Sequence, residues 1–277
     1  MFSIDYVDLY KKTYDFFRLT GCQIRIINGV SKSFKEILNK EHALTNLSIE
    51  ENYNYSKSEI EYIVTNFRFE YQQIDLPCGI STKGDLRKNT LEYIFKGNLE
   101  GKSILDVGCA YGYFCFEAEK YGAKRILGTE LKTHRFVGAN ILKTILKSKA
   151  EFINRDIIKE KLEEKFDVIL LLNVIHHLEF PFYSLKVLSD LCLDTLIIEF
   201  PTTDDVKFKS TLKKYRWFKS SKNPYVGVSL LKEKDQTFVF NEEALKRAVV
   251  DNFGYFKSIE FHKSPFNKKR KIAICKK

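Results

Sequence analysis

From residue 103 onward, short apolar runs alternate with longer stretches in which apolar residues recur at helical spacing. Strands that alternate with helices in this way pair in parallel, and the helices cover both faces of the sheet. The predicted strands are Ser103–Val107, Arg125–Thr129, Glu151–Ile153, Asp167–Leu172 and Thr195–Phe200, and the predicted helices are Phe114–Tyr121, Arg135–Leu146 and Phe182–Leu191. The alternation predicts an α/β fold with a doubly wound sheet.

The last forty residues depart from this alternation of strands and helices. Asn241 is expected to cap a helix that ends near Gly254, and two further strands are expected at Lys257–His262 and Arg270–Cys275. The segment between these strands is short enough for an antiparallel hairpin at the sheet edge. The sheet is therefore expected to be Rossmann-like, with seven strands and a terminal antiparallel hairpin.

The first 84 residues predict a helical extension. Residues 5–19 are dense in aromatics, and a Ser-Lys-Ser-Glu stretch lies beside a run with one apolar face. That face consists of Ile60, Ile63, Val64 and Phe67. A loop-like stretch at 76–84 precedes a predicted helix at 85–95. We therefore expect an N-terminal extension at 1–84 and one domain at 85–277, with an insertion at 202–235.

The composition excludes several classes of protein. Asp5 and Asp8 stand where a signal peptide would be basic, and no apolar run approaches the roughly 20 residues that cross a bilayer. The six cysteines form no C-x-x-C pair, so neither a zinc site nor a disulfide framework is indicated. We expect mature sequence, a cytoplasmic location, reduced thiols, no membrane segment and no metal.

The segment that begins with the first of these strands carries the most chemical information. The strand ends at Asp106, and a loop with Gly108 and Gly112 turns directly into a helix. Glycines let the backbone pass close to a ligand, and the helix N-terminus offers N–H groups to a carboxylate or phosphate. The loop predicts a site for an anionic small molecule.

Two kinds of ligand compete for such a loop. A dinucleotide site has the pattern G-x-G-x-x-G, whereas here the spacing is Asp106-x-Gly108-x-Ala110-x-Gly112. The carboxylate of Asp106 would repel a diphosphate, but it can accept a hydrogen bond from the ammonium group of an amino-acid-like ligand while loop N–H groups bind its carboxylate. The spacing favours a zwitterion.

The ends of the next two strands extend this interpretation. Glu130 can accept hydrogen bonds from both hydroxyls of a ribose. Asp156 can accept from an adenine amine while Ile157 packs on the ring. Amino acid, ribose and adenine in that order describe S-adenosylmethionine.

These residues resemble the motifs of class I S-adenosylmethionine-dependent methyltransferases, from about Gly101 to Pro201 together with the terminal helix and hairpin. The resemblance implies that S-adenosylmethionine is the cofactor. The implied cofactor-binding residues are Asp106, Gly108, Cys109, Ala110, Gly112, Glu130, Leu131, Asp156, Ile157, Asn173 and Val174. Ala110 stands where the family most often has glycine, which implies slight local tightening.

Within this family, the layout is similar to the wobble-uridine carboxymethyltransferases of tRNA. The similarity involves residues 74–91, the cofactor loop and residues 121–128. Those enzymes have Tyr and Arg after the fourth strand, where this sequence reads Val-Ile-His-His-Leu at 174–178. This departure favours ordinary methyl transfer over carboxymethyl transfer.

Methyl transfer from a sulfonium is an in-line displacement that places the acceptor lone pair about 3 Å from the methyl carbon, with a base where the acceptor loses a proton. The predicted catalytic residues are His176, His177 and Glu199, which follow the fourth and fifth strands. The alternatives are a histidine packed under the next helix and a structural pair of Glu199 with a lysine. Tyr111 and Tyr113 are expected to line the methyl channel or to pack against the N-terminal helices.

The net charge of +10 lies in the last part of the chain, because residues 201–277 hold 19 basic and 8 acidic side chains. The insertion interleaves lysine and arginine with aromatics, and the candidate substrate-binding residues in it are Lys213, Arg216 and Trp217. It can bind RNA through phosphate contacts and stacking, close over a small acidic substrate, or form a lid with solvated lysines. Residues 268–271 are expected to form a solvated hairpin edge.

The resulting prediction is a methyltransferase that acts on an oxygen or nitrogen of a small, anionic acceptor. RNA, especially tRNA, is the alternative partner. A catalytically silent subunit with the cofactor fold is a third possibility. The oligomeric state is left open.

Overall fold

The computed structural model describes residues 54–95, 99–160, 162–202, 223–228 and 238–277. The helix predicted at 5–19 and most of the insertion, with Lys213, Arg216 and Trp217, lie outside the described residues. The chain forms two compact units, and each is described by itself. The first unit contains described residues 54–86, 109–119 and 127–155, and the second contains the others.

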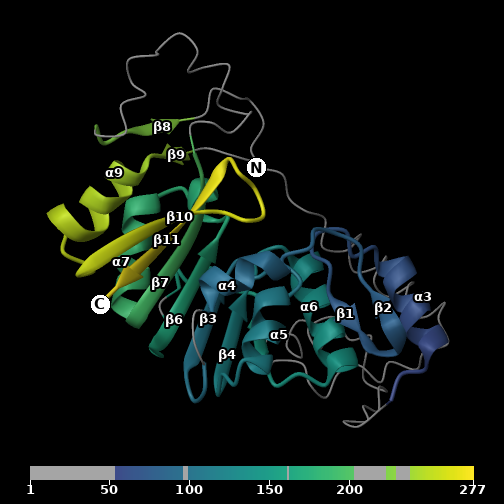
Figure 1. The fold of residues 1–277 in the computed structure, drawn as a ribbon. Helices are drawn as coiled ribbons and strands as arrows, with labels where there is room; N and C mark the ends of the chain where they lie inside the picture. Colours follow the sequence, from purple (N-terminus) through teal and green to yellow (C-terminus); the bar gives the residue numbers. More distant parts are fainter. Residues whose placement is uncertain (1–53, 96–98, 161, 203–222, 229–237) are drawn as a thin grey trace. The chain divides into compact units, whose positions relative to one another are not determined.

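A seven-stranded mixed sheet has the strand order β10-β11-β7-β6-β3-β4-β5 (Figure 1). Its strands are β3 (Ser103–Val107), β4 (Arg125–Thr129), β5 (Glu151–Ile153), β6 (Phe166–Leu172), β7 (Cys192–Pro201), β10 (Ser258–Lys263) and β11 (Arg270–Lys276). β3, β6 and β7 run parallel, as do β4 and β5, whereas β11 is antiparallel to both β7 and β10. The predicted Rossmann-like sheet with a terminal hairpin is confirmed.

In the second unit, β6 lies in the core of the sheet. Its residues Val168–Leu172 are all buried, with Ile169, Leu170 and Leu171 fully buried, as a parallel strand with both faces covered requires. α7 (Pro181–Leu191) contacts β7 and the 3₁₀ turn Ile175–His177. A proline in the first turn of α7 presets the helical backbone. None of the helices in the described ranges has the length and apolarity that a membrane crossing requires.

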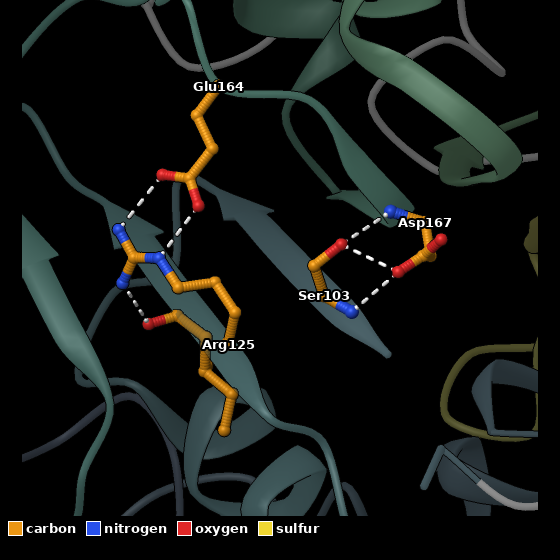
Figure 2. Close-up of polar contacts among 5 residues, drawn as sticks. Ser103, Arg125, Glu164 and Asp167 are labelled. Atoms are coloured by element: carbon orange, nitrogen blue, oxygen red, sulfur yellow. Dashed lines mark hydrogen bonds and ion pairs between the residues drawn. The ribbon is translucent and has the colours of Figure 1, made fainter. Parts of the chain in front are cut away.

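Polar contacts join the amino ends of strands in the same unit (Figure 2). The backbone N and the Oγ of Ser103 donate to Oδ2 of Asp167 over 2.8 and 2.7 Å. These hydrogen bonds hold the pKa of the Asp167 carboxyl below its usual value. Arg125 donates from Nε and Nη2 to the two carboxylate oxygens of Glu164, over 2.8 and 3.0 Å. These contacts therefore join the amino ends of β3 and β6. The loops predicted to bind ligands follow the opposite, carboxyl ends of these strands.

The segment before the terminal hairpin adds a short antiparallel pair, β8 (Val226–Val228) and β9 (Phe238–Phe240). Asn241 caps α9 (Glu242–Lys246) as predicted, because its side chain accepts from the backbone N of Ala244 over 2.9 Å. A π-helix continues over Arg247–Asn252.

The helix predicted at 85–95 is shorter in the structure. Only the 3₁₀ turn Lys88–Thr90 and α4 (Leu91–Ile94) are helical. The backbone of Asp85 instead hydrogen-bonds to Tyr71 and Gln73 in the first unit, so that this residue cannot begin a helix. Long-range backbone pairing overrides the local helical pattern.

The rest of the first unit consists of α3 (Lys57–Phe67), β1 (Asp75–Leu76), β2 (Ile80–Ser81), α5 (Tyr113–Lys120) and α6 (Thr133–Leu146). A capping box between Ser56 and Glu59, in the Ser-Lys-Ser-Glu stretch, begins α3. The stretch predicted to be a loop contains the last residue of β1 and all of β2, and these two strands pair antiparallel.

Candidate functional site

Three residues of the loop after β3 have a left-handed backbone conformation. Gly108 has φ of +73°, Ala110 has φ of +53° and Gly112 has φ of +88°. The N–H of Cys109 donates to the carbonyl of Thr129 over 3.0 Å, and the N–H of Gly112 donates to the carbonyl of Cys109 over 2.9 Å. Of these three residues only Ala110 carries a side chain, and its left-handed backbone conformation costs about 1–2 kcal/mol.

Packing also requires glycine at two of these positions. A Cβ at Gly112 would lie 2.6 Å from Cζ of Phe152, and a Cβ at Gly108 would lie 2.6 Å from Cγ2 of Val174. Both distances are below contact, so each glycine lets a neighbouring side chain approach the loop. Gly108 and Val174, two of the implied cofactor-binding residues, therefore lie close together within the second unit.

Glu130 holds the loop in the first unit. Glu130 is 6% exposed, and its carboxylate accepts from the N–H of Ala110 at Oε2 over 3.0 Å and from the N–H of Lys132 at Oε1 over 2.8 Å. Asn154 donates from Nδ2 to the Glu130 carbonyl over 2.6 Å, which fixes the end of β4. Each carboxylate oxygen retains a second acceptor position. The adjacent Leu131 is 59% exposed, an apolar surface beside these oxygens.

Gln72 is a site residue that sequence reasoning missed. Its Oε1 accepts from the N–H of Tyr111 over 3.1 Å and from the N–H of Tyr113 over 3.5 Å. The expectation that these N–H groups at the head of α5 are unpaired is therefore wrong. The sequence holds no signal for this contact, because 39 residues separate Gln72 from Tyr111.

Tyr111 and Tyr113 are both buried. The Tyr111 ring lies edge-on to Phe69, with centroids 5.1 Å apart, and to His134, with centroids 6.2 Å apart. Burial raises the pKa of Tyr111, and burial together with Arg135 lowers the pKa of His134. The contact with Phe69 supports the packing alternative for Tyr111, because Phe69 belongs to the N-terminal extension.

In the second unit, Asn173 follows β6 in a left-handed conformation with φ of +62°. Its backbone N–H donates to the carbonyl of Glu199 over 2.8 Å, and its side-chain Nδ2 donates to the Glu199 carboxylate. Arg270 donates from Nη1 to Oδ1 of Asn173. The side chain of Asn173 is thus held by residues from β7 and β11.

Glu199 is fully buried and serves as the centre of this cluster. Besides Asn173, it accepts from Nη2 of Arg87 over 2.7 Å and from Oγ of Ser264. The guanidinium of Arg87 also lies 3.9 Å from the ring centroid of Phe266. These contacts support the alternative role of Glu199 as one half of a structural pair, with an arginine in place of the expected lysine.

The two histidines after β6 differ in exposure. His176 is 1% exposed and His177 is exposed, with ring centroids 4.0 Å apart. The N–H of His177 donates to the carbonyl of Val174 over 2.8 Å. Of the two predicted bases, His177 alone is open to solvent, and its catalytic role stays a prediction.

Three other predicted cofactor residues, Asp106, Asp156 and Ile157, lie in the second unit. Asp106 is 2% exposed at the end of β3, where it pairs with Leu170. Asp156 accepts from the N–H of Ile158 over 3.1 Å, so that one of its oxygens caps the following turn, and Ile157 is buried. Their predicted contacts with a ligand stay predictions.

The terminal hairpin differs from the solvated edge expected at 268–271. Arg270 contacts Asn173, and Lys271 pairs with the carboxylate of Glu242. That prediction is wrong for these two residues. Their partners come from distant parts of the chain, which a run of basic residues does not identify.

The chain matches a family model described as "Methyltransferase domain" over residues 81–255. A curated relative, the tRNA U34 carboxymethyltransferase of Helicobacter acinonychis (strain Sheeba), is 31% identical over 146 residues, which are 49% of this chain and 53% of that protein. The tRNA U34 carboxymethyltransferase of Campylobacter concisus (strain 13826) is 35% identical over 112 residues, which are 37% of this chain and 38% of that protein. The chain spans about half the length of the curated relatives it matches, or less.

Solved structures show the fold alone. The N-terminal domain of EvdMO1, in the presence of SAH and D-fucose, is 14% identical, with a TM-score of 0.56 over 80% of this chain and 97% of that chain. Magnesium protoporphyrin IX methyltransferase from Synechocystis PCC 6803, with bound SAM, is 17% identical, with a TM-score of 0.50 over 69% of this chain and 77% of that chain. Because the family model covers more than half of the chain, including the strand–loop–helix motif, the chain belongs to the methyltransferase-domain family, within the S-adenosylmethionine-dependent methyltransferases that its sequence resembles.

Proposed function

We propose that this protein transfers a methyl group from S-adenosylmethionine to an oxygen or nitrogen of its acceptor. The observation that carries the proposal is the buried carboxylate of Glu130 at the end of β4. Two backbone N–H groups orient it, and each of its oxygens keeps an acceptor position. That arrangement suits a pair of vicinal hydroxyls, as on a ribose.

The residues of the first unit fit the cofactor. Glycine at 112 brings the loop backbone against Phe152, and Leu131 presents an exposed apolar surface next to Glu130. In the second unit, we retain Asp106 for the ammonium group, Asp156 and Ile157 for the adenine, and the backbones of Asn173 and Val174 as the remaining cofactor contacts. The cofactor would supply the methyl group of its sulfonium, and the rest of the cofactor would be the leaving group, as a neutral thioether.

The residues of this chain contribute orientation and proton removal. Glu130 fixes the loop through Ala110, and an ordered loop reduces the entropy lost when reactants are aligned. His177 is the proposed base for an acceptor that must lose a proton, because it is exposed after β6 and imidazole titrates near neutrality. We assign Glu199 a structural role instead, because its carboxylate accepts hydrogen bonds from Arg87, Asn173 and Ser264.

Calorimetry with S-adenosylhomocysteine tests the cofactor site. Glu130→Gln is expected to weaken binding by about tenfold or more, because the amide loses one charge-assisted acceptor for the hydroxyls. Glu92→Gln, at an exposed position of α4, is the matched control and is expected to bind like the unmodified protein. Thermal melting checks that both variants fold. Absence of binding by the unmodified protein, or unchanged binding by Glu130→Gln, would contradict the proposal.

A second candidate function is modification of tRNA. The curated relatives named as tRNA U34 carboxymethyltransferases favour it, together with the basic excess in residues 201–277. The insertion residues predicted to bind substrate would then contact phosphates and stack on bases. The competing acceptor is a small anionic metabolite, which the same basic residues would bind.

Bulk tRNA distinguishes these acceptors. A tRNA enzyme is expected to bind it with an affinity that falls steeply with salt, and Lys213→Ala, Lys214→Ala and Arg216→Ala in combination are expected to reduce both the affinity and that slope. Mass spectrometry of nucleosides from treated tRNA would identify the product. If tRNA gains no modification and its binding is insensitive to the triple substitution, the acceptor is a small molecule.

The transferred group is a separate question, and one observation favours a carboxymethyl group. In the second unit, the guanidiniums of Arg87 and Arg270 lie around a single carboxylate, that of Glu199, through direct contacts and through Asn173. These contacts bring two guanidiniums to one carboxylate, and a carboxylate on the transferred group would be a further anionic partner for Arg270. If this is the role of Arg270, Arg270→Met is expected to abolish carboxymethyl transfer while methyl transfer from S-adenosylmethionine persists. Equal loss of both products would contradict it.

A further inference from the structure

Two aromatic side chains at the end of α3 form the base of a ring stack in the first unit. The rings of Phe67 and Phe69 have their centroids 4.6 Å apart and their planes at 28°. Arg68, between them, ends the helix in a left-handed conformation with φ of +56°, so that the chain turns sharply and Phe69 packs on Phe67. Because both phenylalanines are buried, the base of the stack is held inside the unit.

His134, in the first turn of α6, extends this stack to the surface. Its imidazole lies parallel to the Phe67 ring, with centroids 4.4 Å apart and planes 6° apart, and the Tyr111 ring stands edge-on to it. His134 is exposed, and because Phe67 covers one face of the imidazole, the exposed surface belongs to the other face and the ring edges. Burial lowers the pKa of His134 and Arg135 lowers it further, so that the ring is uncharged near pH 7.

Positive charge accompanies these rings. Cζ of Arg135 lies 4.3 Å from the ring centroid of Tyr71, which is 40% exposed, so that a cation–π contact holds the guanidinium on the N-terminal extension. Three of the four charged side chains next to the stacked rings in the sequence are basic, namely Arg68, Lys132 and Arg135, and the fourth is Glu70. An exposed ring with an excess of positive charge beside it suits an aromatic group carried on an anionic chain.

We propose that His134 stacks on an unpaired nucleobase of RNA, while Lys132 and Arg135 bind the adjoining phosphates. The N-terminal extension and the first turn of α6 then form an RNA-binding surface. This inference rests on the second candidate function, in which the acceptor is RNA, and it adds a contact outside the basic insertion. Unpaired bases can place a face against a protein ring, whereas paired bases within a helix are stacked on one another. The surface therefore prefers RNA with unpaired bases.

Fluorescence anisotropy with two labelled RNA probes tests the stacking. One probe is a stem-loop with unpaired loop bases, and the other is a fully paired duplex with the same number of phosphates. His134→Ala removes the ring and is expected to weaken stem-loop binding about fivefold or more, while duplex binding changes less than about twofold. His134→Phe keeps a flat ring and is expected to retain stem-loop binding within about twofold. Equal weakening of both probes by His134→Ala, or equal loss in the two variants, would overturn the proposal.

The salt dependence of stem-loop binding tests the phosphate contacts. Arg135→Gln is expected to weaken binding and to reduce the slope of log affinity against log salt by about 0.7–0.9, the value for one phosphate. Lys149→Gln is the matched control, because it removes the same charge from an exposed position beyond the other end of α6, about 20 Å away. It is expected to leave the slope unchanged. Equal effects of the two substitutions would show that only the net charge of the protein matters, and the proposal is then wrong.

Calorimetry with S-adenosylhomocysteine and thermal melting separate this role from others. His134→Ala is expected to fold and to bind S-adenosylhomocysteine within about twofold of the unmodified protein. Weaker cofactor binding with unchanged RNA binding would place His134 in the cofactor site and overturn the proposal.

The unmodified protein separates this inference from the function on which it rests. If it binds neither RNA probe, the RNA acceptor is wrong, and the proposed surface with it. If it binds both probes equally and His134→Ala changes neither affinity, the surface is wrong while an RNA acceptor stands. A preference for the stem-loop that His134→Ala removes supports both.

Discussion

Nη2 of Arg87 lies 2.7 Å from Oε2 of Glu199, and the two side chains are 7% and 0% exposed. Taking both charges out of water carries a desolvation penalty, which their attraction and the added hydrogen bonds from Asn173 and Ser264 offset. A pair of this kind is sensitive to loss of one partner, because the remaining charge cannot reach solvent.

Arg87→Met is therefore expected to lower the free energy of unfolding by about 3–5 kcal/mol, since it leaves the Glu199 carboxylate buried without its charge partner. Urea denaturation measures the change. Lys57→Met, in an exposed pair with Glu61, is the control and is expected to change stability by less than about 0.5 kcal/mol. Arg87→Met combined with Glu199→Gln is expected to be more stable than Arg87→Met alone. A loss below about 1 kcal/mol for the single variant would contradict the role of the pair.

Asp167 predicts a pH dependence of stability. Its folded pKa is lowered from 3.8 by hydrogen bonds from Ser103, so that the unfolded chain binds the proton more readily. The stabilisation is present above the unfolded pKa and is lost as the pH falls through the folded pKa. Ser103→Ala removes one of these donors and is expected to lose less stability between pH 7 and pH 3 than the unmodified protein.

Urea denaturation at both pH values checks this expectation. Thr65→Ala, at an exposed position of α3, is the control and is expected to retain the pH dependence of the unmodified protein. The same pH dependence in Ser103→Ala as in the unmodified protein would show that these hydrogen bonds do not shift the folded pKa.

Gly108→Ala is expected to lower stability through backbone strain and through overpacking, and Gly101→Ala is the control for the backbone strain alone. Gly108 and Gly101 have nearly equal φ angles, +73° and +72°, but a Cβ at Gly108 would meet Val174 at 2.6 Å, whereas a Cβ at Gly101 would meet no atom within 4 Å. Gly101→Ala is expected to cost about 1 kcal/mol from the backbone conformation. Gly108→Ala is expected to cost about 1–3 kcal/mol more, from overpacking.

Chemical denaturation measures both variants, and Val174→Ala in the Gly108→Ala background is expected to restore part of the steric loss. Equal destabilisation at the two glycines would show that the contact with Val174 relaxes without cost.

Cysteine labelling tests the burial of the thiols. Burial raises the pKa of Cys192 to about 11, and burial also raises the pKa of Cys275, whereas Cys78 is exposed. Because the thiolate is the reactive form, iodoacetamide at pH 8 is expected to alkylate Cys78 well before the other two in the folded protein. Peptide mass spectrometry over a time course measures the rates. In urea, the three cysteines are expected to be alkylated at similar rates, because the reagent reaches all of them. Similar alkylation rates in the folded protein would contradict the burial of Cys192 and Cys275.

The alternation of apolar runs identified the strands closely. The predicted bounds of β3, β4 and β5 match those in the structure, and the capping residue Asn241 lies where it was predicted. These features depend on residues a few positions apart, since side-chain periodicity and capping act within one strand or one helical turn. The loop motif from Asp106 to Gly112 was likewise readable, because its residues are close together in the sequence.

The contacts at the candidate site depended on tertiary structure. Gln72 meets the loop across 39 positions, and Arg87 meets Glu199 across 112 positions. Arg270, expected in a solvated edge, contacts Asn173 across 97 positions.

The sequence by itself determined the α/β architecture, the methyltransferase family and the acidic residues suited to the cofactor. Only the tertiary structure decided that Glu199 is part of a buried ion pair and that Gln72 occupies the N–H groups of the loop. The physical reason is that periodicity reports which face of an element is buried, whereas the partner of a buried polar group is chosen by the chain segments that packing brings beside it.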